Sequence, residues 1–235
     1  MLTKEDFLNG QVILIDKPLK WTSFQVVNKL RGALKKRFKI RKIKVGHAGT
    51  LDPLATGLLI ICTGKFTKKI NQFQAETKEY TGTFTLGATT PSYDLETEIN
   101  QVFPTEHLTE ELILKTTQKF TGEIEQFPPI FSAIQKDGVR LYDLARKGES
   151  VEIKSRKTHI YEFEITRIEL PRVDFRVVCS KGTYIRSLAY DFGKSLNSGA
   201  HLSALRRTKS GDFNVKDGVS PDAFVESIFK DEEKS

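Results

Sequence analysis

Residues 46–62 read GHAGTLDPLATGLLIIC. The short apolar run Leu58–Cys62 is typical of a buried strand, so the glycine-bracketed segment before it is a loop that a rigid strand holds in place. Asp52 stands in the middle of that loop. A simple turn is one interpretation, because aspartate favours turns and Pro53 disfavours helix at the preceding residue. An active-site carboxylate is the other, and this stretch alone does not choose between them.

Length and composition favour one sizeable domain. A chain of 235 residues buries about 70–75% of its unfolded surface, so we expect a single domain over 1–235. Cys62 and Cys179 lie far apart in strand-like sequence, which suits a reduced interior and gives no disulfide framework. The N-terminal residues lack a basic segment leading into an apolar one, and no apolar run approaches membrane-spanning length. We therefore expect a cytoplasmic protein with no membrane association.

Positive charge is concentrated in one part of the chain. The formal net charge is +7, and residues 17–45 hold eleven lysines and arginines and no acid. Such a stretch can follow a phosphate backbone, because neutralising phosphates releases condensed counterions. A solvated basic face is the alternative, and charge alone does not identify RNA. We expect an RNA-binding segment at about 29–44 and a mobile tail at 230–235.

The apolar patterns alternate between the strand and helix periods along the chain. Strands are expected at 11–16, 58–63, 79–86, 158–169 and 173–179, and helices at 109–120 and 184–197. A further helix opens at Thr22, where Thr22 and Gln25 fit a capping box. Its apolar stripe is expected to be Phe24, Val27, Leu30 and Leu34. These elements predict an α+β fold with a mixed, mostly antiparallel sheet flanked by helices.

Metal and nucleotide cofactors lack sequence support. The four histidines show no close pairing of the kind that metal ligation requires. Neither Gly46–Gly49 nor Gly182-Thr183 completes a dinucleotide or phosphate-loop fingerprint. We expect no metal site and no cofactor.

Further blocks follow the first in a fixed order. Residues 16–23 read DKPLKWTS, 78–87 read KEYTGTFTLG, 128–133 read PPIFSA and 180–188 read SKGTYIRSL. Together with residues 46–58 they resemble the signatures of the bacterial tRNA pseudouridine-55 synthases of the TruB type, in order and spacing across residues 11–213. One such block is a weak signal, but five in order are a strong one. The resemblance favours the active-site interpretation of Asp52.

The resemblance implies the pseudouridine synthase fold, as a catalytic domain without the PUA domain of longer relatives. It implies that Asp52, Arg186 and Tyr80 are catalytic, with Arg186 holding the ionised Asp52 and Tyr80 stacking on the target uracil. Asp52 either attacks C1′ as a nucleophile or removes a 2′ proton to give a glycal, and the sequence does not choose. The substrate-binding residues that it implies, with Lys17 added from charge clustering, are His47, Tyr184, Leu205 and Lys17.

The implied reaction isomerises uridine 55 in the T-loop of tRNA after the base is flipped out, and it needs no cofactor. The T-arm of tRNA is the expected partner of a monomer that has no obligate protein partner. Three positions depart from the family pattern, at Lys20, Gln135 and Asp137, and they concern substrate contacts. One alternative is an RNA-binding or tRNA-folding protein without essential catalysis. Another is a retaining glycoside hydrolase or nucleosidase, which needs a second carboxyl group.

Overall fold

The computed structural model describes residues 2–132, 135–136, 139–140 and 153–230. Asp137 and all of the 230–235 tail after Lys230 lie outside the described residues. Contacts divide the chain into two compact units. Unit 1 comprises Met1–Tyr80 and Arg206–Ser235, and unit 2 comprises Thr81–Leu205. The expectation of a single domain over 1–235 stays a prediction.

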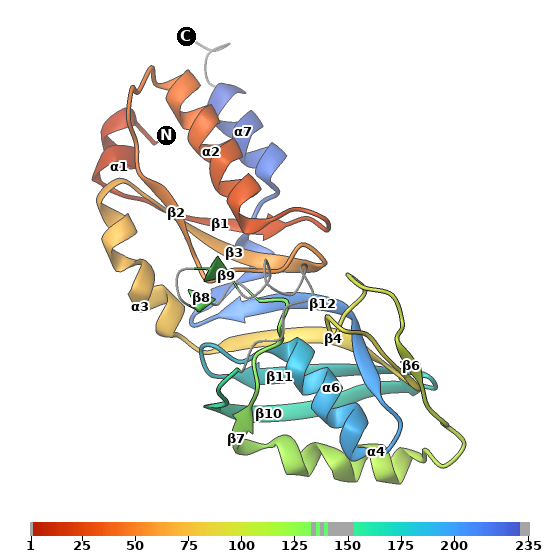
Figure 1. Cartoon of the computed structure of the whole chain (residues 1–235). Coiled ribbons are helices and arrows are strands. Elements are labelled where there is room, and N and C mark those ends of the chain that lie inside the picture. The colour runs from red at the N-terminus through yellow and green to blue at the C-terminus, as the bar shows by residue number, and fades with distance from the viewer. Residues whose placement is uncertain (1, 133–134, 137–138, 141–152, 231–235) are drawn as a thin grey trace. The chain divides into compact units, whose positions relative to one another are not determined.

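Unit 1 is built on antiparallel strands (Figure 1). β1 (Val12–Lys17) and β2 (Val45–Ala48) both pair with β3 (Ala55–Thr63). The last residues of β12 (Ala200–Ser210) pair with β13 (Phe213–Asn214). The predicted buried run at 58–62 is confirmed, because every residue from Leu58 to Cys62 is fully buried. This strand carries the loop of Asp52 at its start.

The helices and 3-10 turns described in unit 1 are α1 (Lys4–Asn9), α2 (Ser23–Arg37), η1 (Gly64–Lys69), α3 (Ile70–Ala75), η3 (Val215–Asp217) and α7 (Pro221–Phe229). α2 and α7 pack side by side (Figure 1). The capping box predicted at the start of α2 is confirmed, since the Thr22 side chain accepts from the Gln25 backbone and the Gln25 side chain accepts from the Thr22 backbone.

The predicted apolar stripe of α2 is wrong at its first residue. Val27, Leu30 and Leu34 are buried, but Phe24 is 62% exposed. The helix instead buries Ser23 and Val26 at its start. Residues three and four apart share a helix face, so a stripe that passes through 23, 26, 27, 30 and 34 leaves position 24 outside it.

Unit 2 continues with strands in the order β12, β4, β11, β10, β7. Their bounds are β4 (Lys78–Leu86), β7 (Gly122–Gln126), β10 (Arg156–Glu169) and β11 (Arg172–Cys179). β10 pairs antiparallel with both β11 and β7. Two short pairs also occur, β5 (Ala88–Thr89) with β6 (Gln101–Val102) and β8 (Gln135–Lys136) with β9 (Val139–Arg140).

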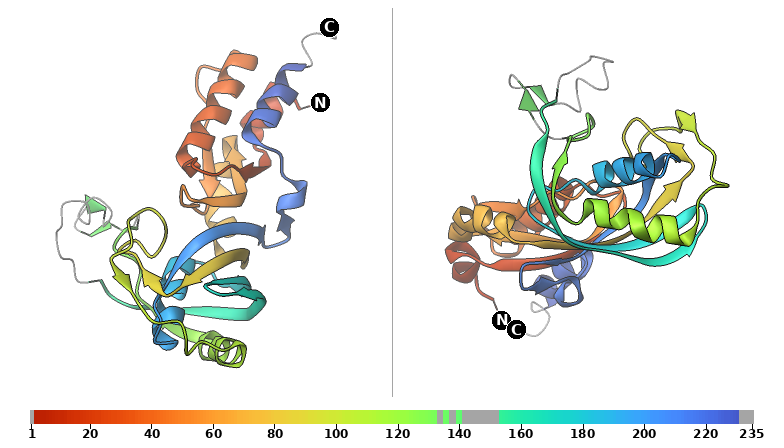
Figure 2. Two further views of the ribbon diagram at one scale, coloured as in Figure 1. Left: turned by 90° about the vertical axis from the view of Figure 1, so that its right-hand side faces the viewer. Right: turned by 90° about the horizontal axis from the view of Figure 1, so that it is seen from below.

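Two helices, α4 (Glu110–Thr117) and α6 (Ile185–Ser195), cover the same face of β10 and β11 (Figure 2). α4 continues into the 3-10 turn η2 (Gln118–Phe120). The core beneath them is aromatic: the Phe84 ring lies 4.1 Å from that of Phe175 and 5.6 Å from that of Phe192. A rigid core of this kind fixes the position of α6, whose first turn carries Arg186.

The predicted fold class is confirmed. The pairs β1–β3, β2–β3, β12–β13, β10–β11, β10–β7, β5–β6 and β8–β9 are antiparallel, and isolated parallel bridges join Ile15 to Val219 and Asp94 to Leu202. Each predicted strand and helix occurs within a few residues of its expected bounds. Cys62 and Cys179 are both buried, as expected. Among the described residues, no helix is both long enough and apolar enough to span a membrane.

Candidate active site

The backbone of the loop that carries Asp52 is held by hydrogen bonds from other residues of unit 1. The Ser23 hydroxyl accepts from the Leu51 N–H at 2.9 Å and donates to the Leu51 carbonyl at 3.1 Å. The Lys20 N–H donates to the Pro53 carbonyl at 2.8 Å, and the Asp52 carbonyl accepts from Ala55 at 3.0 Å. The residues on both sides of Asp52 are therefore tied to the segment that begins α2. The Asp52 side chain is half-buried.

Arg207 joins the two ends of this loop. Its guanidinium is almost fully buried and donates through Nε to the Leu58 carbonyl at 2.7 Å and through Nη2 to the Gly49 carbonyl at 3.1 Å. Gly57 permits the approach of this strand, because a Cβ there would lie 2.3 Å from the Arg207 carbonyl oxygen and its φ is +103°. Arg207 thus holds the Asp52 loop in place, and the sequence did not predict this role.

Lys17 is a second buried cation in unit 1. It is fully buried, and its Nζ donates to the carbonyls of Trp21 at 2.6 Å and Pro18 at 2.9 Å. Burial lowers the pKa of Lys17 to about 8, while the negative charge of Asp52 opposes this shift and Arg207 adds to it. Because the Lys17 side chain is buried, the structure gives no support to the expected contact of Lys17 with an RNA phosphate. Its charge instead favours the ionised form of Asp52.

His47 and Tyr80 are the other predicted site residues of unit 1. His47 lies in β2 opposite Ile61 and is half-buried. Burial lowers the pKa of His47, and the positive charge of Arg207 lowers it further. The imidazole is therefore neutral at neutral pH, as suits a side chain that meets a base rather than a phosphate. Tyr80 lies in β4 and is half-buried.

Arg186 lies in unit 2, in the first turn of α6, and is 4% exposed. Its Nη1 donates to the carbonyls of Phe131 at 2.9 Å and Ser92 at 3.3 Å. Its Nε lies 3.6 Å from Oδ2 of Asp94, which is also 4% exposed. Sequence reasoning missed this carboxylate, because Asp94 stands in a polar, turn-like stretch with no local sign of burial. The prediction that Arg186 holds Asp52 stays a prediction.

Tyr184 caps the N-terminus of α6 and is fixed by Gln126, which is fully buried. The Tyr184 N–H donates to Oε1 of Gln126 at 2.7 Å, and Nε2 of Gln126 donates to the Tyr184 carbonyl at 3.0 Å. The Arg156 guanidinium covers the Tyr184 ring at 4.4 Å, which is a favourable cation–π distance. Leu205, in β12, is half-buried. Gln126 and Arg156 were not predicted.

The basic segment at 29–44 divides into two groups of side chains. In the first group, Lys29 pairs with Asp222 of α7, and Nε of Arg37 donates to the Ile228 carbonyl at 2.7 Å. These charges hold α2 against α7. The second group is exposed and consists of Lys35, Lys36, Lys39, Arg41, Lys42 and Lys44. A contact with RNA phosphates is therefore expected from the second group.

Two family models match consecutive parts of the chain. Residues 35–185 match the TruB family pseudouridylate synthase N-terminal domain, and residues 186–235 match the tRNA pseudouridylate synthase B C-terminal domain. The fold and these matches define a pseudouridylate synthase, which is an isomerase. The chain belongs to the TruB family.

Relatives of nearly equal length support this assignment. A protein of Flavobacterium johnsoniae named tRNA pseudouridine synthase B is 69% identical over 228 residues, covering 97% of this chain and 100% of that protein. One of the same name from Phocaeicola vulgatus is 57% identical, covering 97% of both.

Solved structures show the same fold. A chain in a crystal structure titled as a Cbf5-Nop10-Gar1 complex is 30% identical with a TM-score of 0.74, covering 100% of this chain. A chain of an H/ACA RNP bound to a substrate RNA is 29% identical with a TM-score of 0.70, covering 97% of this chain. This chain spans 59% and 56% of those two chains.

Proposed function

We propose that this protein converts uridine 55 in the T-loop of tRNA to pseudouridine. The proposal is supported by relatives named tRNA pseudouridine synthase B that match along nearly the whole chain. The observation that carries it is the Asp52 loop, in which a half-buried carboxylate stands on a fixed backbone within the field of the buried cation Lys17. An aspartate that is kept ionised and rigidly placed is the group that this chemistry requires.

The reaction rearranges bonds within one nucleotide. The bond from C1′ to N1 breaks, the base turns, and a bond from C1′ to C5 forms. One proton leaves C5 and one is taken up at N1, so nothing is oxidised or reduced and no cofactor is consumed. Asp52 acts either by attacking C1′ to form a covalent sugar ester or by removing a 2′ proton to give a glycal. Both routes need the carboxylate form, which the positive charge of Lys17 favours.

The other site residues handle the flipped base. Extruding a uridine from a folded loop costs a few kcal/mol of stacking and pairing, which contacts in a pocket offset. In this proposal Tyr80 stacks on the uracil and takes part in removing the C5 proton, and Tyr184 and Leu205 line the pocket. Arg186 orients the ionised Asp52, and the neutral His47 occupies the space that the base vacates.

The substrate is bound largely by the shape and phosphates of the T-arm, as is usual for structured RNA. The exposed group Lys35, Lys36, Lys39, Arg41, Lys42 and Lys44 supplies the positive charge for this contact. We propose that the protein acts as a monomer in the cytoplasm, and its two buried cysteines, which lie far apart in the sequence, suit that reduced compartment.

Incubation with an unmodified tRNA transcript, followed by position-resolved pseudouridine mapping, tests the proposal. We expect conversion at position 55 and at no other uridine of the T-arm. Conversion at another site would contradict the substrate assignment. Tight binding of the transcript with no conversion at any position would favour the alternative of an RNA-binding protein without catalysis.

A further inference from the structure

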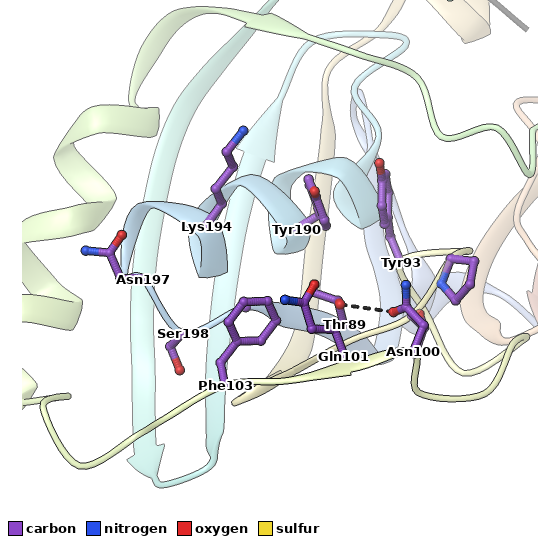
Figure 3. A pocket seen from close by; sticks show the side chains of 12 residues that line it. Thr89, Tyr93, Asn100, Gln101, Phe103, Tyr190, Lys194, Asn197 and Ser198 are labelled. Carbon is purple, nitrogen blue, oxygen red and sulfur yellow. Dashed lines mark hydrogen bonds between the residues drawn. The ribbon is translucent and has the colours of Figure 1, made fainter.

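A cavity of about 560 Å³ lies within unit 2, and none of the predicted site residues is among those that line it (Figure 3). One wall comes from α6 and the turn after it, which supply Tyr190, Lys194 and Asn197. The other wall comes from strands β5 and β6 and the residues next to them, which supply Thr89, Asn100, Gln101 and Phe103. The volume falls within the range of about 300–1,000 Å³ that is typical of small-ligand sites. One nucleotide fits within this space.

Aromatic rings line this cavity. The rings of Tyr93 and Tyr190 stack with centroids 4.2 Å apart and an angle of 22° between their planes. Both side chains are only half-buried, as is Phe103 across the cavity. Figure 3 shows Tyr190 and Lys194 along the same side of α6, with Phe103 and Gln101 across from them. Half-buried rings at a cavity wall are a stacking surface for a planar base.

The backbone of Tyr93 is strained. Its φ is +63°, a left-handed conformation that glycine and asparagine adopt readily and a bulky side chain rarely does. Hydrogen bonds fix the residue there, because its N–H donates to Thr90 and its carbonyl accepts from Leu202. The turn needs only a left-handed residue at this position, and asparagine would supply that without strain. A tyrosine at this strained position therefore points to a use for its ring, which stacks on Tyr190 at the cavity wall.

The polar groups of the cavity suit the edge and phosphate of a nucleotide. Amide side chains come from Asn100, Gln101 and Asn197, and the Thr89 hydroxyl orients Asn100 by donating to its Oδ1 at 3.0 Å. Among the described lining residues, Lys194 carries the formal charge, which is positive. Asp191 is an acid close by whose charge acts on Tyr93 and Lys194, but it does not line the cavity.

We propose that this cavity binds a second unpaired nucleotide of the substrate RNA, distinct from the uridine that reacts. The base stacks on the Tyr93–Tyr190 pair, the amide side chains contact its edge, and Lys194 pairs with its phosphate. This inference rests on the proposed function for the identity of the RNA. It needs no catalytic step, so its tests measure binding alone.

The first test measures binding of the four 5′-nucleoside monophosphates by NMR saturation transfer to the full-length protein. Two variants remove one element each. Tyr93→Asn keeps the left-handed backbone without strain and removes the ring, and Lys194→Gln removes the cation. We expect binding of at least one nucleotide, with loss of the transfer signal in both variants. Lys119→Gln, which removes an exposed lysine of unit 2, is the matched control.

The second test places the same variants in an Asp52→Asn background and measures affinity for the tRNA transcript. We expect tRNA affinity to fall about tenfold in Tyr93→Asn, the loss typical of one stacked base. A transcript carrying 4-thiouridine should also crosslink to the peptides that contain Tyr93 or Tyr190. Since this background does not depend on turnover, a failure of the proposed function is read separately, from pseudouridine mapping with the unaltered protein.

The outcomes divide cleanly. Nucleotide binding without any change of tRNA affinity in the variants would assign the cavity to free nucleotides and overturn the RNA proposal. Absence of both nucleotide binding and crosslinking would overturn the site itself. Thermal melts accompany each variant, because Tyr93→Asn relieves backbone strain but also removes the stacking contact with Tyr190. Should Tyr93→Asn fail to fold, Lys194→Gln and the crosslink decide the matter.

Discussion

Nε of Arg186 lies 3.6 Å from Oδ2 of Asp94, and each of the two residues is 4% exposed. This distance makes the contact an ion pair rather than a hydrogen bond. The same guanidinium donates to the carbonyls of Phe131 and Ser92. A buried guanidinium that is held from several sides has one orientation, which is what the proposed role of Arg186 requires.

Asp94→Asn should destabilise the protein by about 2–3 kcal/mol and lower turnover. Removing one partner of a buried ion pair costs about 3–5 kcal/mol, and the carbonyl partners of Arg186 offset part of this. Urea unfolding measures the loss, with Asp174→Asn as a control that removes the charge of a half-buried aspartate bonded to Thr83. In an Arg186→Met background the same Asp94→Asn change should cost much less. Equal costs in both backgrounds would show that the pair is not coupled.

Arg207→Lys should lower kcat while leaving tRNA affinity within about twofold. The lysine keeps the charge but cannot donate to the Gly49 and Leu58 carbonyls in the geometry of a guanidinium. Because those carbonyls flank the Asp52 loop, its backbone loses a fixed position. Arg206→Lys is the matched control, since its guanidinium pairs with Asp16 at 2.7 Å and reaches Thr56 through the hydroxyl at 3.4 Å rather than through backbone carbonyls. A rise in KM with unchanged kcat would assign Arg207 to binding instead.

Much of the fold could be predicted because its signals are local. The alternation of β11, the apolar run of β3 and the capping box at Thr22 each depend on neighbouring residues. Phe24 was assigned to the wrong face because two overlapping stripes fit the helical period, and only packing chooses between them. Asp94 and Gln126 could not be predicted, because their partners are distant in sequence and nothing local reveals their burial.

The site was predicted less completely than the fold. The resemblance identified the loop of Asp52 but not the side chains that hold it. Ser23 and Arg207 bond to main-chain atoms, and any residue type at positions 51 or 58 offers those atoms. Bonds to main-chain atoms do not depend on the residue type at those positions, so the sequence there carries no sign of them. The burial of Lys17 is likewise a property of the folded chain.

Asp191→Asn should stabilise the protein at neutral pH. Burial raises the pKa of Asp191 from 3.8 to about 6, with the charge of Lys194 partly opposing the shift. The folded state therefore binds this proton more tightly than the unfolded chain, so stability falls as pH rises from about 4 to 6 and the cost persists above that.

The variant should gain about 1–2 kcal/mol at pH 7, a value reduced for partial exposure, and almost nothing at pH 3.5, which lies below the unfolded pKa of 3.8. Urea unfolding at the two pH values measures the difference. Asp212→Asn makes the same change at an exposed aspartate and is the matched control. An equal gain at both pH values would contradict this origin.

Replacing Lys35 and Lys42 together by glutamine should weaken tRNA binding and reduce its dependence on salt. Each lost phosphate contact lowers the slope of log affinity against log salt by about 0.7–0.9. Both side chains are exposed, whereas Arg37 bonds to α7 and its loss would also disturb packing. Replacing the exposed Lys115 and Lys119 is the control of equal charge. An unchanged slope in the Lys35 and Lys42 variant would remove this segment from the RNA-binding surface.

Single-turnover conversion of a tRNA transcript by Asp52→Asn tests the central claim most directly. The amide keeps the size of the side chain but neither attacks C1′ as a carboxylate nor removes a proton. We predict that pseudouridine formation falls by at least a thousandfold, while tRNA affinity and melting temperature stay close to those of the unaltered protein. Turnover within tenfold of the unaltered protein would show that another group performs the chemistry.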